Sequence, residues 1–273
     1  MTTTSTKFEL ASYVIHYSPL VDRKSFLQPQ LKLLEPEWVT ESDVVLESLP
    51  WRHSERVLGV SKRQIAADLG VNARSISRSR RKARFESYYL RYISLVGRKY
   101  QKHSYGSLPR FERLPKQILE LNAMHIYAIF LFLQSGKEWG LVLEDDAVME
   151  PNFFEKLEGI CKLKYAKPVW MNLNGGAGLV RTKSDPSPDM NGLFQVIPST
   201  TRCATAYVIN RRYVERLKDL ILVHGLPDWL PIDVFYQVAN RKLRALAFWS
   251  EPPIVIQGSE SGRYKSNLGQ HRI

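Results

Sequence analysis

The feature that most constrains the fold is a run of apolar residues that ends in three acids. Residues Leu141 to Ala147 read Leu-Val-Leu-Glu-Asp-Asp-Ala. A short apolar run that is bounded by polar residues predicts a buried strand. Residues 115–134 before it carry apolar side chains at helical spacing, and residues 152–163, which follow Pro151, do the same. A buried strand between two amphipathic helices predicts an α/β fold.

The remaining elements are expected to alternate in the same way. Further strands are predicted over 8–17, 37–40, 169–176, 205–210 and 253–257. Further helices are predicted directly after the first strand and over 211–222 and 231–243. Strands that alternate with helices predict a mainly parallel central sheet flanked by helices. The stretch 184–192 and the polar tail 258–273 are predicted to be loops, the tail a flexible one.

Composition narrows the class of protein. The 273 residues are 44% hydrophobic, so the chain can bury a core without disulfides or a structural metal. The formal charge of +12 predicts attraction to anions, which include nucleic acid, an acidic membrane surface and a nucleotide diphosphate. Only two cysteines, Cys161 and Cys203, are present, which favours a reducing cytoplasmic compartment. We expect neither a signal peptide in the first ten residues nor a membrane span.

The acids at the end of the apolar run predict a site. Ligands of open α/β sheets bind outside the carboxyl ends of strands, where Glu144, Asp145 and Asp146 are expected to lie. Adjacent carboxylates repel one another unless a cation compensates them, and Mn²⁺ or Mg²⁺ bridging to a diphosphate would do so. The simpler interpretation is a solvated turn whose acids cap the helix that follows Pro151.

Three blocks, in the same order, resemble glycosyltransferase family 25, the lipopolysaccharide-biosynthesis galactosyltransferase-like family. The first block is YVIHYSPLVDRK over 13–24. The second joins LNAMHIYAIFLF over 121–132 to GLVLEDDAVMEPNFFEKL over 140–157. The third joins TRCATAYVINRRYVERL over 201–217 to PIDVFYQ over 231–237. The resemblance covers most of residues 8–257 and is specific in the central block.

The resemblance implies a fold and an activity. It implies one GT-A-like, Rossmann-related domain over 1–273 that transfers a hexose with inversion. The donor would be a nucleotide-diphosphate sugar, UDP-galactose by analogy with the family. The acceptor would be a hydroxyl of a glycan, a lipooligosaccharide or a protein, in the cytoplasm or at the inner face of the membrane. A degenerate transferase that binds the donor without turnover is a further alternative.

Roles for single residues follow from this chemistry. Inversion needs a base, and Asp233 matches the family's Asp block in the first turn of a predicted helix, although acids also cap helices there. Asp146, supported by Asp145, is predicted to hold the metal. The predicted donor-binding residues are His16, Tyr17, Arg23, Glu144, Asp145, Asn174 and Gly175. His125 is predicted to position other groups. The tail is predicted to close over phosphates through Ser259, Ser261, Arg263 and Lys265, with His271 as a possible second metal ligand.

A basic segment supports a rival interpretation. Residues 61–84 read as two helices joined by a tight turn at Gly70, which is typical of a helix-turn-helix that enters the DNA major groove. Its cations are Arg74, Arg78, Arg80, Arg81, Lys82 and Arg84. In a glycosyltransferase, residues 50–108 would instead form a basic helical insertion near the acceptor. We favour the transferase, because the blocks on either side of this segment resemble an enzyme.

Overall fold

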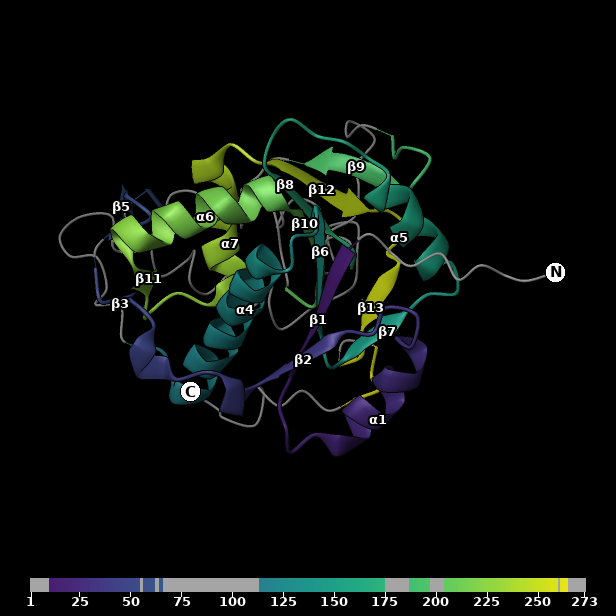
Figure 1. The fold of residues 1–273 in the computed structure, drawn as a ribbon, viewed down its shortest axis with the longest axis horizontal. Coiled ribbons are helices and arrows are strands. Elements are labelled where there is room, and N and C mark those ends of the chain that lie inside the picture. The colour runs from purple at the N-terminus through teal and green to yellow at the C-terminus, as the bar shows by residue number, and fades with distance from the viewer. Residues whose placement is uncertain are drawn as a thin grey trace, which may run out of the picture.

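A central sheet organises the fold. The computed structural model describes residues 10–54, 56–61, 64–65, 113–174, 187–196, 204–259 and 261–264. Within these ranges, seven strands form one sheet in the order β2-β1-β6-β10-β8-β12-β9 (Figure 1). Their bounds are β1 Leu10–His16, β2 Glu37–Thr40, β6 Trp139–Glu144, β8 Val169–Asn172, β9 Leu193–Val196, β10 Ala206–Asn210 and β12 Leu246–Ser250.

The sheet is mixed, so the prediction of a mainly parallel sheet is wrong. Strand β1 runs parallel to β2 and β6, and β12 runs parallel to β8. Strand β10 is antiparallel to both of its neighbours, β6 and β8, and β9 is antiparallel to β12. An apolar run reports that a strand is buried, but not which way it runs. Strand direction depends on the connections, which the apolar pattern does not encode.

Helices cover both faces of the sheet. Their bounds are α1 Val21–Gln30, α4 Lys116–Gln134, α5 Phe153–Cys161, α6 Arg211–His224 and α7 Ile232–Leu243, with short 3₁₀ turns η1 Glu41–Asp43 and η2 Leu46–Ser48. The helices predicted outside residues 61–84 are therefore confirmed to within a few residues. Helix α6 ends at Gly225, whose φ of 74° lies in the region that favours glycine.

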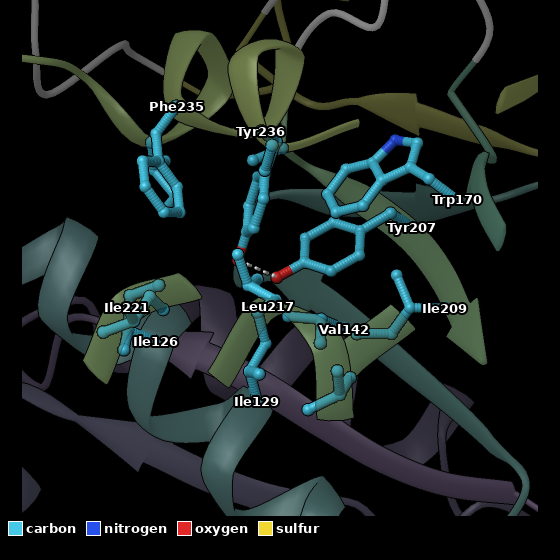
Figure 2. Close-up of a cluster of buried hydrophobic side chains, with 14 of the residues drawn as sticks. Ile126, Ile129, Val142, Trp170, Tyr207, Ile209, Leu217, Ile221, Phe235 and Tyr236 are labelled. Atoms are coloured by element: carbon cyan, nitrogen blue, oxygen red, sulfur yellow. Dashed lines mark hydrogen bonds between the residues drawn. The ribbon is translucent and has the colours of Figure 1, made fainter. Parts of the chain in front are cut away.

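The apolar strands are buried because each face of the sheet has its own core. Val142 packs with α4, α6 and α7, whereas Leu141 and Leu143 pack on the other face with α1 and α5. Figure 1 shows these two helix groups on opposite sides of the strands. In the first core, the Trp170 ring stacks on Tyr207 with centroids 4.2 Å apart (Figure 2). Burial on both faces explains the unbroken apolar run in β6.

Short two-stranded ribbons surround the sheet. Strand β3 (Trp51–Arg52) pairs with β11 (Leu226–Pro227), and β4 (Arg56–Val57) pairs with β5 (Val60–Ser61). Strand β7 (Ala147–Met149) pairs with β13 (Val255–Gln257), the strand predicted over 253–257. None of the helices in the described ranges has the length and apolar character needed to cross a membrane.

Apart from the two-residue strands β3, β4, β5 and β11, which were not predicted, the structure differs from the predicted strands at three places. The strand predicted over 141–147 is interrupted, because β6 ends at Glu144 and β7 begins at Ala147, with a turn at Asp145 and Asp146. Strands β9 and β12 were not predicted. Strand β12 begins only two residues after α7, whose last turn closes at Arg244 in the left-handed conformation. The sequence has no glycine or proline there to mark the boundary.

Candidate functional site

The candidate site lies where the chain order of the sheet reverses. From β1 the chain passes through α1 to β2 on one side, and the strand on the other side of β1 is β6. Such a switch point opens a crevice at the carboxyl ends of the two strands. Ile15 of β1 is paired with Glu144 of β6, so the residues that follow both strands meet at this edge.

Asp145 is the centre of the first cluster at this edge. Its Oδ2 lies 3.0 Å from Nδ1 of His16 and accepts a hydrogen bond from the backbone N–H of Tyr17 at 3.2 Å. Its Oδ1 accepts from the Arg23 guanidinium at 2.8 Å. The structure thus brings together four predicted donor-site residues. Both oxygens of this buried carboxylate already have protein donors, which is the arrangement that a buried charge requires.

Glu144 faces the opposite side of the sheet, as expected for neighbouring residues at a strand end. Its Oε1 lies 3.3 Å from Nε2 of His125, and its Oε2 accepts from the Thr205 hydroxyl at 3.1 Å. His125 is fully buried, and its Nδ1 lies 3.1 Å from the hydroxyl of Tyr207. Glu144 is therefore held by residues on the face of the sheet that α4 covers, away from the residues that hold Asp145.

Asp146 is buried but incompletely satisfied. Its Oδ2 accepts a hydrogen bond from the Ser259 hydroxyl at 2.8 Å. Its Oδ1 is buried and has no hydrogen-bond partner in the described part of the chain. Burial, followed by the charge of Glu144, raises the pKa of the Asp146 carboxyl from 3.8 to about 6. The positive charge of Arg23 lowers this pKa, but the effects of burial and of Glu144 outweigh it.

The C-terminal residues fold over Asp146. The N–H of Gly258 donates to the Asp146 carbonyl at 2.7 Å, and the N–H of Tyr264 donates to the Gly258 carbonyl at 3.0 Å. The Arg23 guanidinium lies 5.2 Å from the centre of the Tyr264 ring. Of the predicted tail residues, Ser259 reaches Asp146 and Arg263 lies over the ring of Phe26 at 3.7 Å.

The rest of the predicted tail is placed only in part. The Ser261 hydroxyl donates to the Gly258 carbonyl at 3.1 Å, so it stabilises the tail's own turn. Lys265 and His271 lie outside the described residues, as do Gly175 and Gly176. The basic segment 61–84 also lies outside them, apart from residues 61, 64 and 65.

Tyr17 and Asn174 occupy contrasting environments. The Tyr17 side chain is 43% exposed next to the Asp145 cluster, so its ring is available for stacking. Asn174 follows β8 and is buried, and its N–H donates to Oδ1 of Asn172 at 3.0 Å. Oδ1 of Asn174 has no hydrogen-bond partner among the described residues. Asn174 thus offers a buried acceptor, which is the kind of group that a ligand hydroxyl can satisfy.

Asp233 lies in the first turn of α7 and is partly exposed, as the sequence predicts. Its Oδ1 accepts from the N–H of Val234 at 2.8 Å. Three residues later, the Tyr236 hydroxyl lies 3.0 Å from the hydroxyl of Tyr207 (Figure 2). Tyr207 also contacts His125, so buried polar side chains connect Glu144 to the first turns of α7.

The metal-binding chemistry of the cluster depends on Asp146. Within the described ranges, no three His, Cys, Asp or Glu side chains group together as a metal site. Asp146 nevertheless has an oxygen without a donor, whereas both oxygens of Asp145 are occupied. Mn²⁺ and Mg²⁺ commonly take one or two carboxylates from the protein and the remaining oxygens from substrate phosphates and water. The single carboxylate of Asp146 therefore fits a cation of this kind, whose other ligands would come from phosphates and water.

The sequence interpretation missed four residues of the site. Thr205, Tyr207, Tyr236 and Tyr264 contact predicted residues or one another but were given no role. The first three lie within the blocks that resemble the family, but no single function was assigned to them. Tyr207 lies in an apolar strand and Tyr236 in an apolar helix, where a tyrosine is normally part of the core. The available signal was His125 on the buried face of an apolar helix, because a buried imidazole requires polar partners.

Comparisons with known proteins do not assign the chain to a family. No model of a known protein family matches the sequence, and no curated protein matches it either. The resemblance of three sequence blocks to glycosyltransferase family 25 therefore supports a proposal of function but does not establish one. The geometry at the carboxyl ends of β1 and β6 supplies the physical evidence.

Proposed function

We propose that the chain is an inverting glycosyltransferase that transfers a hexose, galactose by family analogy, from a nucleotide-diphosphate sugar to an acceptor hydroxyl. The observation that carries this proposal is the buried Oδ1 of Asp146 at the switch point of the sheet, which has no hydrogen-bond partner among the described residues. A buried carboxylate oxygen that accepts no hydrogen bond from the described residues is suited to a cation, and a cation there would suit a diphosphate. The order β2-β1-β6 and the resemblance also favour a GT-A-like, Rossmann-related domain.

The donor is proposed to bind along the edge formed by β1 and β6. The exposed Tyr17 ring would stack on the base. The Asn174 Oδ1, which has no partner in the part of the chain that the structure describes, would accept a hydroxyl of the sugar. Arg23, fixed by Asp145, contributes positive charge near the phosphates. A Mn²⁺ or Mg²⁺ ion held by Asp146 would stabilise negative charge on the leaving diphosphate. In this assignment Asp145 acts by holding Arg23 and His16, and Asp146 is the main metal ligand.

Asp233 is the proposed base. The acceptor oxygen forms a bond to the anomeric carbon while the bond from that carbon to the diphosphate oxygen breaks on the opposite face. The hydroxyl proton passes to the Asp233 carboxylate. The first turn of a helix favours the ionised form of a carboxylate, and the Asp233 side chain is partly exposed. The net charge of +12 supports a separate proposal about location. An acidic membrane surface attracts a basic chain, so we propose that the chain attaches to the inner face of a membrane.

A donor screen by thermal unfolding tests the proposal. UDP-galactose, UDP-glucose and related donors are each added with and without Mn²⁺. A ligand at about a hundred times its Kd stabilises the folded state by roughly 2.7 kcal/mol, enough to raise Tm by several degrees. We expect one UDP-sugar to raise Tm only when Mn²⁺ is present. Stabilisation by duplex DNA and by none of the sugar nucleotides would instead support the helix-turn-helix interpretation of residues 61–84.

Two variants separate donor binding from chemistry. Asp146→Ala is expected to lose the metal-dependent rise in Tm, and with it transfer. Asp233→Asn is expected to keep the rise in Tm but to lose transfer, because only the base is removed. Transfer at the wild-type rate in either protein would refute the role given to that residue. Turnover by neither the wild type nor the variants, with donor binding intact, would indicate a degenerate transferase.

A further inference from the structure

A buried line of polar side chains connects the acidic cluster to α7. It runs from Glu144 through His125 and Tyr207 to Tyr236, with successive contacts of 3.3, 3.1 and 3.0 Å. His125 and Tyr207 are completely buried, and Tyr236 is 1% exposed. Figure 2 shows the two tyrosines facing each other in the core, with their hydroxyls joined. Buried polar groups are costly unless each has a partner, so this line is a defined part of the fold.

The chemistry of the four groups allows one order of protons when the imidazole is neutral. The Glu144 carboxylate can only accept, so Nε2 of His125 carries the hydrogen. Nδ1 is then an acceptor and takes the hydroxyl hydrogen of Tyr207. The Tyr207 oxygen in turn accepts from the Tyr236 hydroxyl. Burial raises the pKa of both tyrosines well above 10, so both stay protonated as donors.

Both ends of the line are anchored to elements of the site. At one end, the second oxygen of Glu144 is held by Thr205. At the other end, Tyr236 lies three residues after Asp233, so both belong to the beginning of α7.

A second contact between α4 and α7 reinforces this connection. Asn122 lies three residues before His125, on the same side of α4. Its amide donates to the Leu230 carbonyl and its Oδ1 accepts from the Ile232 N–H, both at 2.9 Å. Through Asn122, helix α4 therefore holds the N-terminus of α7. Through His125, the same helix holds Glu144 at the end of β6.

We propose that His125 and Tyr207 are positioning residues, which fix Glu144 in the donor site relative to Asp233 through this directed line of hydrogen bonds. The inference deepens the proposed function and depends on it for the role of Asp233 as the base, and it takes Glu144 as the donor-binding residue that the sequence predicts. The proton order is a property of the folded protein alone. The order can therefore be tested without substrate, and the effect on transfer can be tested separately.

The first experiment determines the tautomer of His125. Proton–nitrogen correlation spectra of the ¹⁵N-labelled full chain at pH 7 report which ring nitrogen carries the hydrogen, and the spectrum of His125→Gln identifies the signals of His125. We expect the neutral Nε2–H tautomer in the wild type and in Tyr236→Phe. Tyr207→Phe should keep this tautomer, because Glu144 still accepts from Nε2, but should shift the Nδ1 resonance, because Nδ1 has lost its donor. An Nδ1–H tautomer or an imidazolium in the wild type would overturn the proposed order.

The second experiment measures transfer. Tyr207→Phe keeps the ring that stacks on Trp170 and removes the donor to His125. We expect its kcat to fall by about tenfold to a hundredfold, since small displacements of reacting groups are that costly. The KM for the donor should stay within about twofold, because loss of positioning affects the transition state. Tyr236→Phe should show a smaller fall, since Tyr207 still donates to His125.

Tyr213→Phe is the matched control. Tyr213 is fully buried and packs against the same Trp170 ring, but its hydroxyl has no partner among the described residues. Its kcat should equal that of the wild type. An equal fall in Tyr213→Phe and Tyr207→Phe would show general damage to the core and refute the positioning role, as would an unchanged kcat in Tyr207→Phe. Absence of transfer by the wild type would refute the proposed function, while the tautomer measurement would still decide the proton order.

Discussion

Two adjacent aspartates have opposite electrostatic environments. Asp145 is buried with Arg23, His16 and a backbone N–H as donors, whereas Asp146 is buried with a single hydroxyl from Ser259. The difference arises because successive side chains at the end of β6 point in different directions, toward α1 in one case and toward the C-terminal residues in the other. The same residue type is therefore structural at one position and available to a ligand at the next.

The raised pKa of Asp146 predicts how stability depends on pH. Its pKa of about 6 in the folded protein exceeds the ordinary 3.8, so the folded state binds the proton more tightly. The resulting stabilisation is complete below about pH 4 and is lost as the pH rises through about 6. Without divalent cations, the free energy of unfolding of the wild type should fall over this range, relative to Asp146→Asn, by on the order of 1–3 kcal/mol.

Urea unfolding of both proteins between pH 4 and 7 measures this difference. The control is Asp219→Asn on α6, whose carboxylate is largely exposed and lies 4.0 Å from the Lys218 amine. The difference in the free energy of unfolding between Asp219→Asn and the wild type should not change with pH in this way. If the difference in the free energy of unfolding between the wild type and Asp146→Asn stayed constant over this pH range, the raised pKa would be contradicted.

The buried ion pair of Asp145 predicts a large loss of stability when its carboxylate is removed. Asp145→Ala leaves the Arg23 guanidinium, which is 12% exposed, without its carboxylate. Removal of one partner of a buried ion pair typically costs about 3–5 kcal/mol. Lys162→Ala, which breaks the exposed pair with Glu158, should cost less than about 1 kcal/mol. Chemical unfolding measures both values, and equal losses would show that the Asp145 cluster has no special role in stability.

At the scale of elements, the ribbon of β7 and β13 carries the C-terminal residues to the site. Gln257 is paired with Ala147, so Gly258 lies beside Asp146. A Cβ atom on Gly258 would lie 2.5 Å from the Tyr264 ring and 2.8 Å from the Asp146 carbonyl. Such distances require a shift, and here one of the two atoms belongs to the backbone. Glycine is thus required for the close approach of this segment.

Gly258→Ala is expected to separate the C-terminal residues from Asp146. The overlap should cost about 1–3 kcal/mol of stability, and loss of the Ser259 hydrogen bond should weaken donor-induced stabilisation. Gly136→Ala is the control, because it strains a positive φ of 75° but has open space and lies outside the site. It should lower Tm while the rise caused by the donor stays the same. Equal donor responses in the two variants would show that this segment does not contribute to the site.

For the molecule as a whole, the charge of +12 predicts the response to salt. Electrostatic attraction between exposed charges is screened beyond a Debye length of about 8 Å at physiological ionic strength. We expect the chain to sediment with vesicles that contain an anionic phospholipid at about 0.05 M salt and to be released at about 0.5 M. Vesicles of zwitterionic lipid are the control. Binding to both kinds of vesicle, or binding that salt does not reduce, would contradict peripheral electrostatic attachment.

The sequence predicted the α/β class and most elements of the fold. Strand β6 was visible because Leu141, Val142 and Leu143 are apolar on both faces, and α4 because its apolar side chains recur at helical spacing. Strand direction was not visible, since β10 has the same apolar character as the strands it opposes. Strand β12 was missed because no glycine or proline separates it from α7, and the short strand β9 was missed as well.

The sequence alone determined which chemical groups this protein places at a strand end. An apolar run that is followed by Glu144, Asp145 and Asp146 is enough to predict a buried strand that ends in three acids. Only the tertiary structure decided how those acids differ. His16, Arg23, His125, Tyr207 and Ser259 come from distant parts of the chain. A pKa or a hydrogen-bond order depends on atoms within a few ångströms, and only the folded sheet brings those atoms together.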